Sequence, residues 1–271
     1  MKICIIGNSH ASALKLAMDT GWSRSDFDID YMVLPGGGGP YLSREKSRLK
    51  PRRNSFKMAS NVAGGAEGGV DVADYDAIWV SGVGFNVSLR GISNKETHPL
   101  MLARINTWPV GASGLPRITE RFMRQLVKSD IASSASWRVC QDVVDMGSAR
   151  LVIHPAPRPG AAAFSDETHP LVADYGEKGA GDPIREMMNI GDAMLHELAL
   201  ETDPGIQVAR YPDDVLDDGF TRPEYLRKND VLHVGAEIGA AMLDQMAYLT
   251  TGPHHKEERL SEAPAPQANL Q

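Results

Sequence analysis

Two short motifs at opposite ends of the chain carry side chains suited to nucleophilic catalysis. Ser9 lies in the sequence Gly-Asn-Ser-His-Ala, and Asp230 and His233 lie in the sequence Asn-Asp-Val-Leu-His. A serine hydroxyl becomes a good nucleophile when an imidazole takes its proton, and a carboxylate orients that imidazole and stabilises its charged form. The three residue types therefore indicate a Ser-His-Asp triad that attacks an acyl carbonyl.

The position of Ser9 suits a nucleophile. The apolar run from Lys2 to Ile6 predicts a strand, and residues Ala11 to Thr20 predict an amphipathic helix. A serine at this strand-to-helix turn lies at the carboxyl edge of a sheet, where the helix N-terminus and the Ser9 N–H favour an oxyanion. Taken alone, the motif fits equally well a serine that only caps the helix. The missing glycines exclude a dinucleotide-binding G-x-G-x-x-G motif.

An Asp-x-x-His sequence occurs twice, at Asp166 to His169 and at Asp230 to His233. The first is followed by Pro170 and falls in the loop after the fourth expected strand, whereas the second follows the fifth strand and precedes the final helix. Residues three apart at a helix start can point the same way, so the second pair can present an oriented imidazole to Ser9. We therefore assign the acid and the base to Asp230 and His233.

Five short apolar runs rich in β-branched residues predict the strands that position these motifs. Stretches long enough for crossover helices separate them, which is typical of a parallel sheet. The runs are Lys2 to Ile6, Ile29 to Leu34, Ala77 to Ser81, Arg150 to His154 and Ile206 to Tyr211. We expect an α/β protein with a flavodoxin-like three-layer α/β/α sandwich, whose five-stranded parallel sheet has the order 2-1-3-4-5.

Apolar residues at helical spacing predict three further helices, around residues 118–126, 184–198 and 234–249. Residues 1–250 are expected to form a single catalytic domain with insertions near 35–74 and 87–147, both over the carboxyl edge of the sheet. The polar, proline-rich tail, residues 251–271, is expected to be disordered.

The composition of the chain argues against several classes of function. The net charge of −7 argues against a general nucleic-acid binder. The two cysteines have no metal-ligand spacing, no apolar run is long enough to span a membrane, and the chain opens directly into a strand. We expect a cytoplasmic protein that binds neither nucleic acid nor membrane; the sequence does not indicate its oligomeric state.

The order of the motifs resembles that of the SGNH/GDSL hydrolase superfamily. Four blocks carry the resemblance: Gly7-Asn8-Ser9, the glycine run Gly36 to Gly39, Gly84-Phe85-Asn86 and Asp230 to His233. Each follows its expected strand. The chain departs from the family pattern in Asn8, where aspartate is commoner, in His10 and in Val87, and these departures weaken any inference to lipase-type substrates.

This resemblance implies a serine esterase that needs no cofactor and no metal. It gives Ser9, His233 and Asp230 the roles of the triad. The oxyanion would be bound by the Ser9 N–H, one glycine of the run (Gly37 or Gly38) and the Asn86 side chain. Glycine suits such a donor because it lets the backbone approach a substrate closely.

Three other features are open to two interpretations each. His10 adjoins the nucleophile and His154 ends the fourth strand, so both are candidates for substrate binding, although capping or packing explains them equally simply. Between Arg44 and Arg53 six of ten residues are basic. Such a run is usually a solvated loop, but it also suits an anionic partner.

The leading functional hypothesis is hydrolysis of a small or saccharide-borne ester, as in an O-deacetylase. An acyltransferase that passes the acyl group to a sugar hydroxyl with the same triad is an alternative, and a catalytically silent binding module is another. The α/β-hydrolase fold is disfavoured, because there the nucleophile follows a later strand and the acid and base lie on separate loops.

Overall fold

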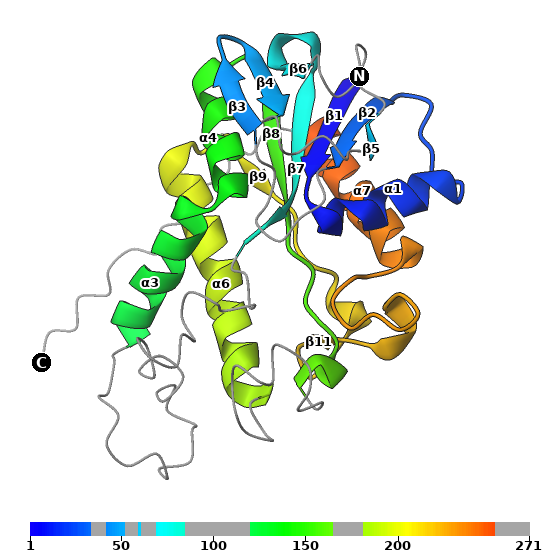
Figure 1. Cartoon of the computed structure of the whole chain (residues 1–271), viewed down its shortest axis with the longest axis vertical. Helices are drawn as coiled ribbons and strands as arrows, with labels where there is room; N and C mark the ends of the chain where they lie inside the picture. Colours follow the sequence, from blue (N-terminus) through cyan, green and yellow to red (C-terminus); the bar gives the residue numbers. More distant parts are fainter. Residues whose placement is uncertain (34–41, 52–58, 61–68, 85–119, 165–180, 253–271) are drawn as a thin grey trace, which may run out of the picture.

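The structure is a computed structural model that describes residues 1–33, 42–51, 59–60, 69–84, 120–164 and 181–252. Its main sheet has the order β5-β2-β1-β7-β8-β9 (Figure 1). The strands are β5 (Ala59–Ser60), β2 (Asp28–Val33), β1 (Lys2–Gly7), β7 (Ala77–Val83), β8 (Arg150–Pro155) and β9 (Gln207–Val208).

The five strands from β2 to β9 are parallel to one another. They correspond to the five predicted strands in the predicted order, which confirms the α/β class and the parallel sheet. The sheet differs from the prediction by one addition, because β5 pairs antiparallel with β2 through Met32 and Val33.

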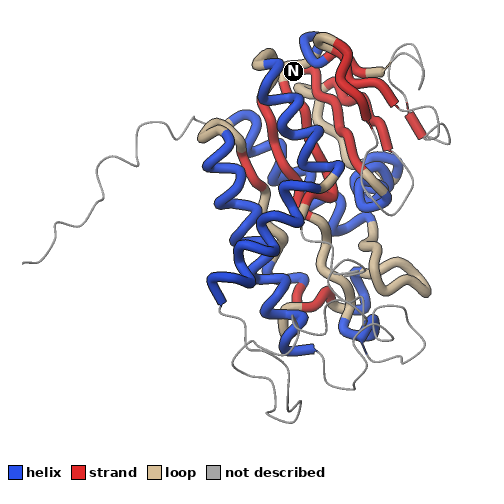
Figure 2. Tube along the Cα trace, turned by 60° about the vertical axis from the view of Figure 1, so that its left-hand side comes forward, coloured by secondary structure: helices blue, strands red, loops and turns tan. Residues whose placement is uncertain are grey.

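Side chains of the central strands alternate between the two faces of the sheet, as the pleat requires. Along β1, Ile3 and Ile5 pack on one face with helices α1 (Ser12–Asp19) and α7 (Ala236–Thr251). Cys4 and Ile6 pack on the other face, which is covered by α3 (Glu120–Ser133), α4 (Ala135–Met146) and α6 (Gly181–Thr202) (Figures 1 and 2). The predicted three-layer sandwich is therefore confirmed.

The first and last helices lie in close contact on their shared face. Gly239 of α7 approaches α1 so closely that a Cβ there would lie 2.1 Å from the Ala13 carbonyl oxygen. Each helix follows a parallel strand of the sheet, so each begins near its carboxyl edge. The residues just before the two helices, Ser9 and His233 among them, are thereby brought to the same edge.

Part of the first expected insertion forms a small second sheet in the order β3-β4-β6, which lies beside the amino ends of β1 and β7 and not, as expected, over the carboxyl edge (Figure 1). Its strands are β3 (Leu42–Glu45), β4 (Arg48–Pro51) and β6 (Val70–Asp71). The β3-β4 hairpin turns at Lys46 and Ser47, with Lys46 at a φ of 58°. Leu42, Leu49 and Val70 are buried on the side of this sheet that faces the protein core.

Two local expectations need correction. The fifth strand was predicted to reach Tyr211, but β9 ends at Val208, and the Arg210 N–H donates to Gln245 Oε1 at 2.7 Å instead of to a strand. The second expected insertion includes α4, which packs directly on the sheet through Trp137 and Cys140. Residues 120–147 therefore supply helices of the second face.

The remaining short elements lie in the connections. They are one hairpin, β10 (Leu216–Asp217) with β11 (Phe220–Thr221), and the 3-10 turns η1 (Ser9–Ala11), η3 (Val72–Asp74), η5 (Ala161–Phe164), η6 (Asp213–Val215) and η7 (Pro223–Tyr225). Among the helices of the described ranges, none is long and apolar enough to cross a membrane.

Candidate active site

The nucleophile turn is organised by Asn8. Its Oδ1 accepts a hydrogen bond from the His10 N–H at 2.9 Å, and its Nδ2 donates to the Gly82 carbonyl of β7 at 3.2 Å. Asn8, and not Ser9, is thus the capping residue of the turn. This leaves the Ser9 hydroxyl without the capping role that the sequence alone allowed.

The start of the first helix differs from the expected one. A 3-10 turn over residues 9–11 comes first, and the α-helix begins at Ser12. The N–H groups of His10 and Ala11 donate to Asn8 within this turn. Among the turn and loop hydrogen bonds of the described residues, none uses the Ser9 N–H, so this donor suits an oxyanion at the position predicted for it.

The Asp230 carboxylate organises the loop that precedes the final helix, α7. Its Oδ1 accepts from the N–H of Leu232 at 2.8 Å and from the N–H of His233 at 3.0 Å, and its Oδ2 accepts from His233 Nδ1 at 2.7 Å. The final helix begins only at Ala236. The two side chains are therefore aligned by a carboxylate-capped turn before the helix and not, as expected, by the helix start itself.

Hydrogen bonds to the Asp230 carboxylate affect its pKa more than burial does. Burial acts to raise the pKa of Asp230, but the donors from Leu232 and His233 more than offset it, so the pKa lies below its ordinary value. Asp230 is consequently ionised at neutral pH. With Nδ1 held by Asp230, the His233 ring leaves Nε2 as the nitrogen that can take a proton.

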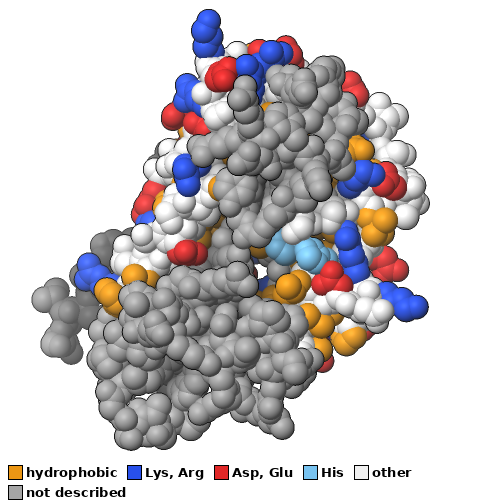
Figure 3. All heavy atoms as spheres, in the orientation of Figure 1, with side chains coloured by type: hydrophobic (Ala, Val, Ile, Leu, Met, Phe, Trp, Pro, Cys, Tyr) orange, Lys and Arg blue, Asp and Glu red, His pale blue; other side chains and the backbone are white. Residues whose placement is uncertain are grey.

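The two loops meet at His10. The rings of His10 and His233 lie 5.3 Å apart between centroids and are tilted by 35°. Figure 3 shows histidine side chains gathered at one place on the surface of the molecule. Among the described residues, no hydrogen bond joins Ser9 Oγ to His233. Catalytic hydrogen bonds often tighten only when substrate is bound, so this geometry is compatible with the predicted triad.

His10 is held neutral by its surroundings. Burial, and after it the neighbouring His233, lowers the pKa of His10 to about 4, although Asp230 acts in the opposite direction. Its Nδ1 is buried without a hydrogen-bond partner in the described part of the chain. A ring with so low a pKa is a weak base, so His10 is a poor acceptor for the proton of the nucleophile.

His154 lies deeper than expected for a residue that contacts substrate. Its side chain is only 1% exposed, and its Nδ1 lies 2.7 Å from the hydroxyl oxygen of Ser81 on β7. Burial lowers the pKa of His154 to about 3, so the ring is neutral. Its observed role is to link β8 with β7 below the edge of the sheet, and direct contact with substrate stays a prediction.

The remaining members of the predicted site lie outside the described residues. These are the glycine run with Gly37 and Gly38, and Asn86 of the third block. The first Asp-x-x-His sequence, residues 166–169, lies outside them as well. Gly84, the first residue of the third block, is described and has a φ of 145°.

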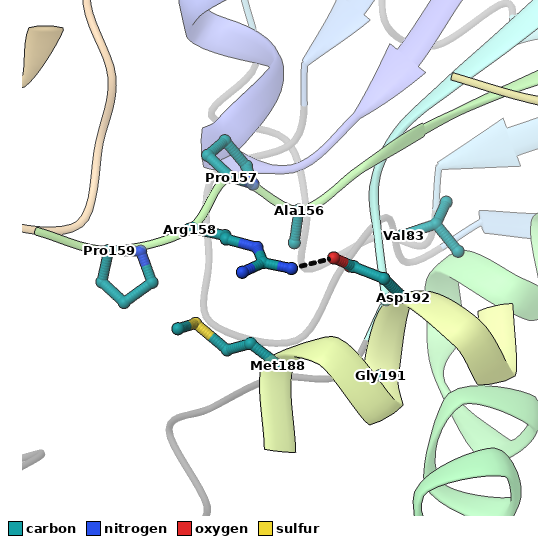
Figure 4. Close-up of a pocket in the computed structure, with 9 residues that line it drawn as sticks. Val83, Ala156, Pro157, Arg158, Pro159, Met188, Gly191 and Asp192 are labelled. Carbon is teal, nitrogen blue, oxygen red and sulfur yellow. Dashed lines mark hydrogen bonds and ion pairs between the residues drawn. The ribbon is translucent and has the colours of Figure 1, made fainter. Parts of the chain in front are cut away.

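A cavity of about 440 Å³ lies at the ends of β8 and β9, beside α6. Polar side chains line it: Arg158, Asp192, His196, Arg210, Tyr211 and Asp213. Arg158 and Asp192 also line a smaller cavity, of about 30 Å³, that reaches Val83 and Gly84 (Figure 4). The Arg158-Asp192 ion pair, at 2.5 Å, therefore lies between the larger cavity and the end of β7.

The polar cavity is connected to the loop that carries Asp230. Gly160, two residues after Arg158, donates its N–H to the carbonyl of Val231 at 2.8 Å. Thr221 Oγ1 donates to the Arg158 carbonyl at 2.5 Å and lies 2.9 Å from the Tyr211 hydroxyl. The segment from Arg158 to Gly160 thus contacts both the cavity and the loop that carries Asp230.

Sequence reasoning missed Arg227, Ser12 and Arg158. Arg227 donates to Ser12 Oγ at 2.7 Å and so bridges the two loops. No local pattern distinguishes these side chains from ordinary surface residues, because their partners lie far away in sequence. Asn8 carried a partial signal, since an asparagine after a strand often caps the following turn.

Within the described ranges, no three His, Cys, Asp or Glu side chains are grouped so that they could hold a metal ion. Both cysteines are buried and form no disulfide. Comparison with protein-family models, with curated proteins and with solved structures finds no match for this chain.

Proposed function

We propose that the chain is a serine acyl-ester hydrolase of the SGNH/GDSL kind, with Ser9 as nucleophile. The observation that carries this proposal is the 2.7 Å hydrogen bond between His233 Nδ1 and Asp230 Oδ2, in a loop that meets the Ser9 turn. An oriented imidazole beside a serine at a strand-to-helix turn is the arrangement that serine hydrolysis needs.

In the proposed mechanism Ser9 Oγ attacks the acyl carbonyl while His233 Nε2 takes the hydroxyl proton. Asp230 stabilises the imidazolium, which then returns the proton to the leaving alcohol. The Ser9 N–H binds the oxyanion, together with the predicted donors Asn86 and Gly37 or Gly38. Water activated by His233 hydrolyses the acyl-enzyme and restores the free serine.

The polar cavity supports a saccharide as the alcohol part of the substrate. Its two arginines and two aspartates balance in charge. Arg158 and Asp192 already pair with each other, but a lipid chain would cover Arg210 and Asp213 without giving them polar partners, and an anion would face Asp192 and Asp213. Hydroxyl groups both donate and accept hydrogen bonds, so a neutral sugar can bind to the charged side chains of both signs that line the cavity. An O-deacetylase acting on a saccharide ester is therefore the favoured form of the proposal.

The acyltransferase alternative would use an acyl thioester of a phosphate-bearing carrier as donor, but the described part of the basic run lies near the amino ends of β1 and β7 (Figure 1) and not beside Ser9. Arg44 pairs with Asp145 at 3.1 Å and Lys50 pairs with Glu45 at 2.6 Å, whereas Lys46 and Arg48 form no ion pair within the described residues. Consumption of a thioester only when a sugar acceptor is present would favour transfer over hydrolysis.

The experiment that tests the proposal is hydrolysis of p-nitrophenyl acetate by wild type, Ser9→Ala and His233→Ala, with folding checked by circular dichroism. Loss of activity in both folded variants is the expected result. Full activity of folded Ser9→Ala would exclude Ser9 as nucleophile. An inactive wild type would favour the transferase or the silent binding module.

A further inference from the structure

Arg227 contacts both members of the acid-base pair through its main chain. Its N–H donates to the His233 carbonyl at 2.9 Å, and its carbonyl accepts from the Asp230 N–H at 3.0 Å. These two bonds close the loop around the carboxylate and the imidazole. Any movement of the Arg227 backbone therefore moves the proposed acid and base with it.

The side chain of the same residue reaches the nucleophile turn at the other end of the chain. Arg227 Nε donates to the Val234 carbonyl at 3.2 Å, and Nη2 donates to Ser12 Oγ at 2.7 Å. The Ser12 hydroxyl in turn donates to the carbonyl oxygen of Ser9. Its single proton is used toward Ser9, so its oxygen is free to accept from Arg227.

We propose that Arg227 and Ser12 form a positioning pair that sets the place of Ser9 relative to His233. The proposal rests on the proposed function, because the arrangement it fixes is that of nucleophile and base. Neither residue touches the substrate; each acts through the residues that do.

The chemistry of arginine suits this task. Its planar guanidinium holds donors in fixed, different directions, so one side chain can bind the Val234 carbonyl and Ser12 together, whereas lysine offers a single charged point. Within the described residues Arg227 forms no ion pair, and its side chain donates there to neutral oxygens. The side chain is therefore used as a rigid brace and not as a counter-ion.

The test compares Arg227→Met, Ser12→Ala and the double variant with wild type. Arg150→Met and Ser43→Ala are matched controls, because Arg150 Nη1 also donates to a carbonyl, that of Thr250, and Ser43 Oγ to that of Lys50, both away from the site. The readouts are kcat and KM for p-nitrophenyl acetate, the rate of reaction with a fluorophosphonate, and the thermal midpoint.

Each single variant should lower kcat and the fluorophosphonate rate by about 10- to 100-fold, since misplacement of reacting groups by about 1 Å has effects of this size. KM should change by less than about twofold. The double variant should be no slower than the slower single one, because both substitutions break the same connection. Ser12→Thr, which keeps the hydroxyl, should restore most of the rate.

Wild-type rates in folded Arg227→Met, or effects that multiply in the double variant, would overturn the proposal. A second readout does not depend on activity: the ¹⁵N signals of the His233 ring should shift in Ser12→Ala and stay unchanged in Ser43→Ala. If wild type neither hydrolyses ester nor reacts with fluorophosphonate, the proposed function fails, and unshifted ring signals in Ser12→Ala would separately refute the pairing.

Discussion

The Asn8 side chain joins the nucleophile turn to the neighbouring strand, through the 3.2 Å hydrogen bond from Nδ2 to the Gly82 carbonyl. Gly82 has a φ of 79°, and a Cβ at this position would lie 2.2 Å from Asn8 Oδ1. The amide of Asn8 therefore fills the space that the missing side chain of Gly82 leaves. An asparagine can serve here because it donates to β7 and accepts from His10 at once.

Asn8→Asp should lower activity and stability. Aspartate keeps the acceptor for the His10 N–H but places an oxygen against the Gly82 carbonyl, which loses its buried partner at a cost of about 1–3 kcal/mol. We expect a lower midpoint in urea unfolding and a kcat reduced by about tenfold, because the Ser9 turn is no longer tied to β7. An unchanged midpoint would show that the Gly82 bond is not formed in solution.

Asp230→Asn should abolish most of the activity without unfolding the chain. The amide would donate toward His233 Nδ1, which forces the ring proton onto Nε2 and blocks proton transfer from Ser9. A loss in kcat of about 10³-fold or more is expected from the wrong tautomer. Steady-state kinetics on folded protein checks this, and a loss smaller than tenfold would remove Asp230 from the triad.

Acid should destabilise the protein through two histidines whose pKa values are lowered in the folded state. His10 and His154 have pKa values lowered to about 4 and about 3, so the unfolded chain binds more protons than the native one between pH 6.5 and these values. Stability is thus greatest above pH 6.5 and falls as the pH drops through this window. Urea midpoints at pH 7.5 and 5.0 should differ less for His154→Asn, which can still bond Ser81, than for wild type.

Equal pH dependence of His154→Asn and wild type would contradict this account of His154. The Asp230 carboxylate contributes in the same direction but at lower pH. Its lowered folded pKa means that its stabilisation is present above the pKa of the unfolded carboxyl and is lost as the pH falls through the folded value. Comparison above pH 5 therefore isolates the histidines.

Filling the polar cavity should impair saccharide substrates selectively. Ala193 of α6 lines the cavity and Leu200 of the same helix is 53% exposed and does not, so Ala193→Trp can be compared with Leu200→Trp. Ala193→Trp should lower kcat/KM for O-acetylated disaccharides by about tenfold or more and leave p-nitrophenyl acetate nearly unaffected. Equal effects on both substrates would exclude the cavity as the sugar site.

The sheet could be predicted because its strands are buried on both faces. Runs such as Leu151 to Ile153 are apolar throughout, which separates them from the amphipathic helices. The antiparallel edge strand β5 could not be found in this way, because it spans only Ala59–Ser60, and the other edge strand, β9, is shorter than predicted, at Gln207–Val208. Segments this short carry no periodicity, and their pairing depends on the strand beside them.

Helix α4 carried signals that the prediction of an insertion passed over. Ser134 caps the helix, with its Oγ accepting from the Trp137 N–H at 3.1 Å, and Gly147 ends it with a φ of 66°. Trp137, Cys140 and Val143 have helical spacing and are buried. A serine before an apolar stripe and a glycine after it predict a helix wherever they occur.

The pairing of Asp230 with His233 could be predicted because it is local and needs only three residues of chain. The bond from Arg227 to Ser12 could not, since it spans 215 positions and depends on the packing of α1 against α7. The polar cavity could not be predicted from the sequence for the same reason. Its walls come from α6, β9 and the segment around Arg158, which only the folded chain brings together.

The most direct test of the central claim is mass-spectrometric mapping of the residue that a fluorophosphonate modifies in folded wild type, with His233→Ala in parallel. The account predicts one adduct on Ser9, formed at least about 100-fold more slowly in folded His233→Ala because the base is missing. An adduct on another serine, or a Ser9 adduct formed equally fast without His233, would contradict it.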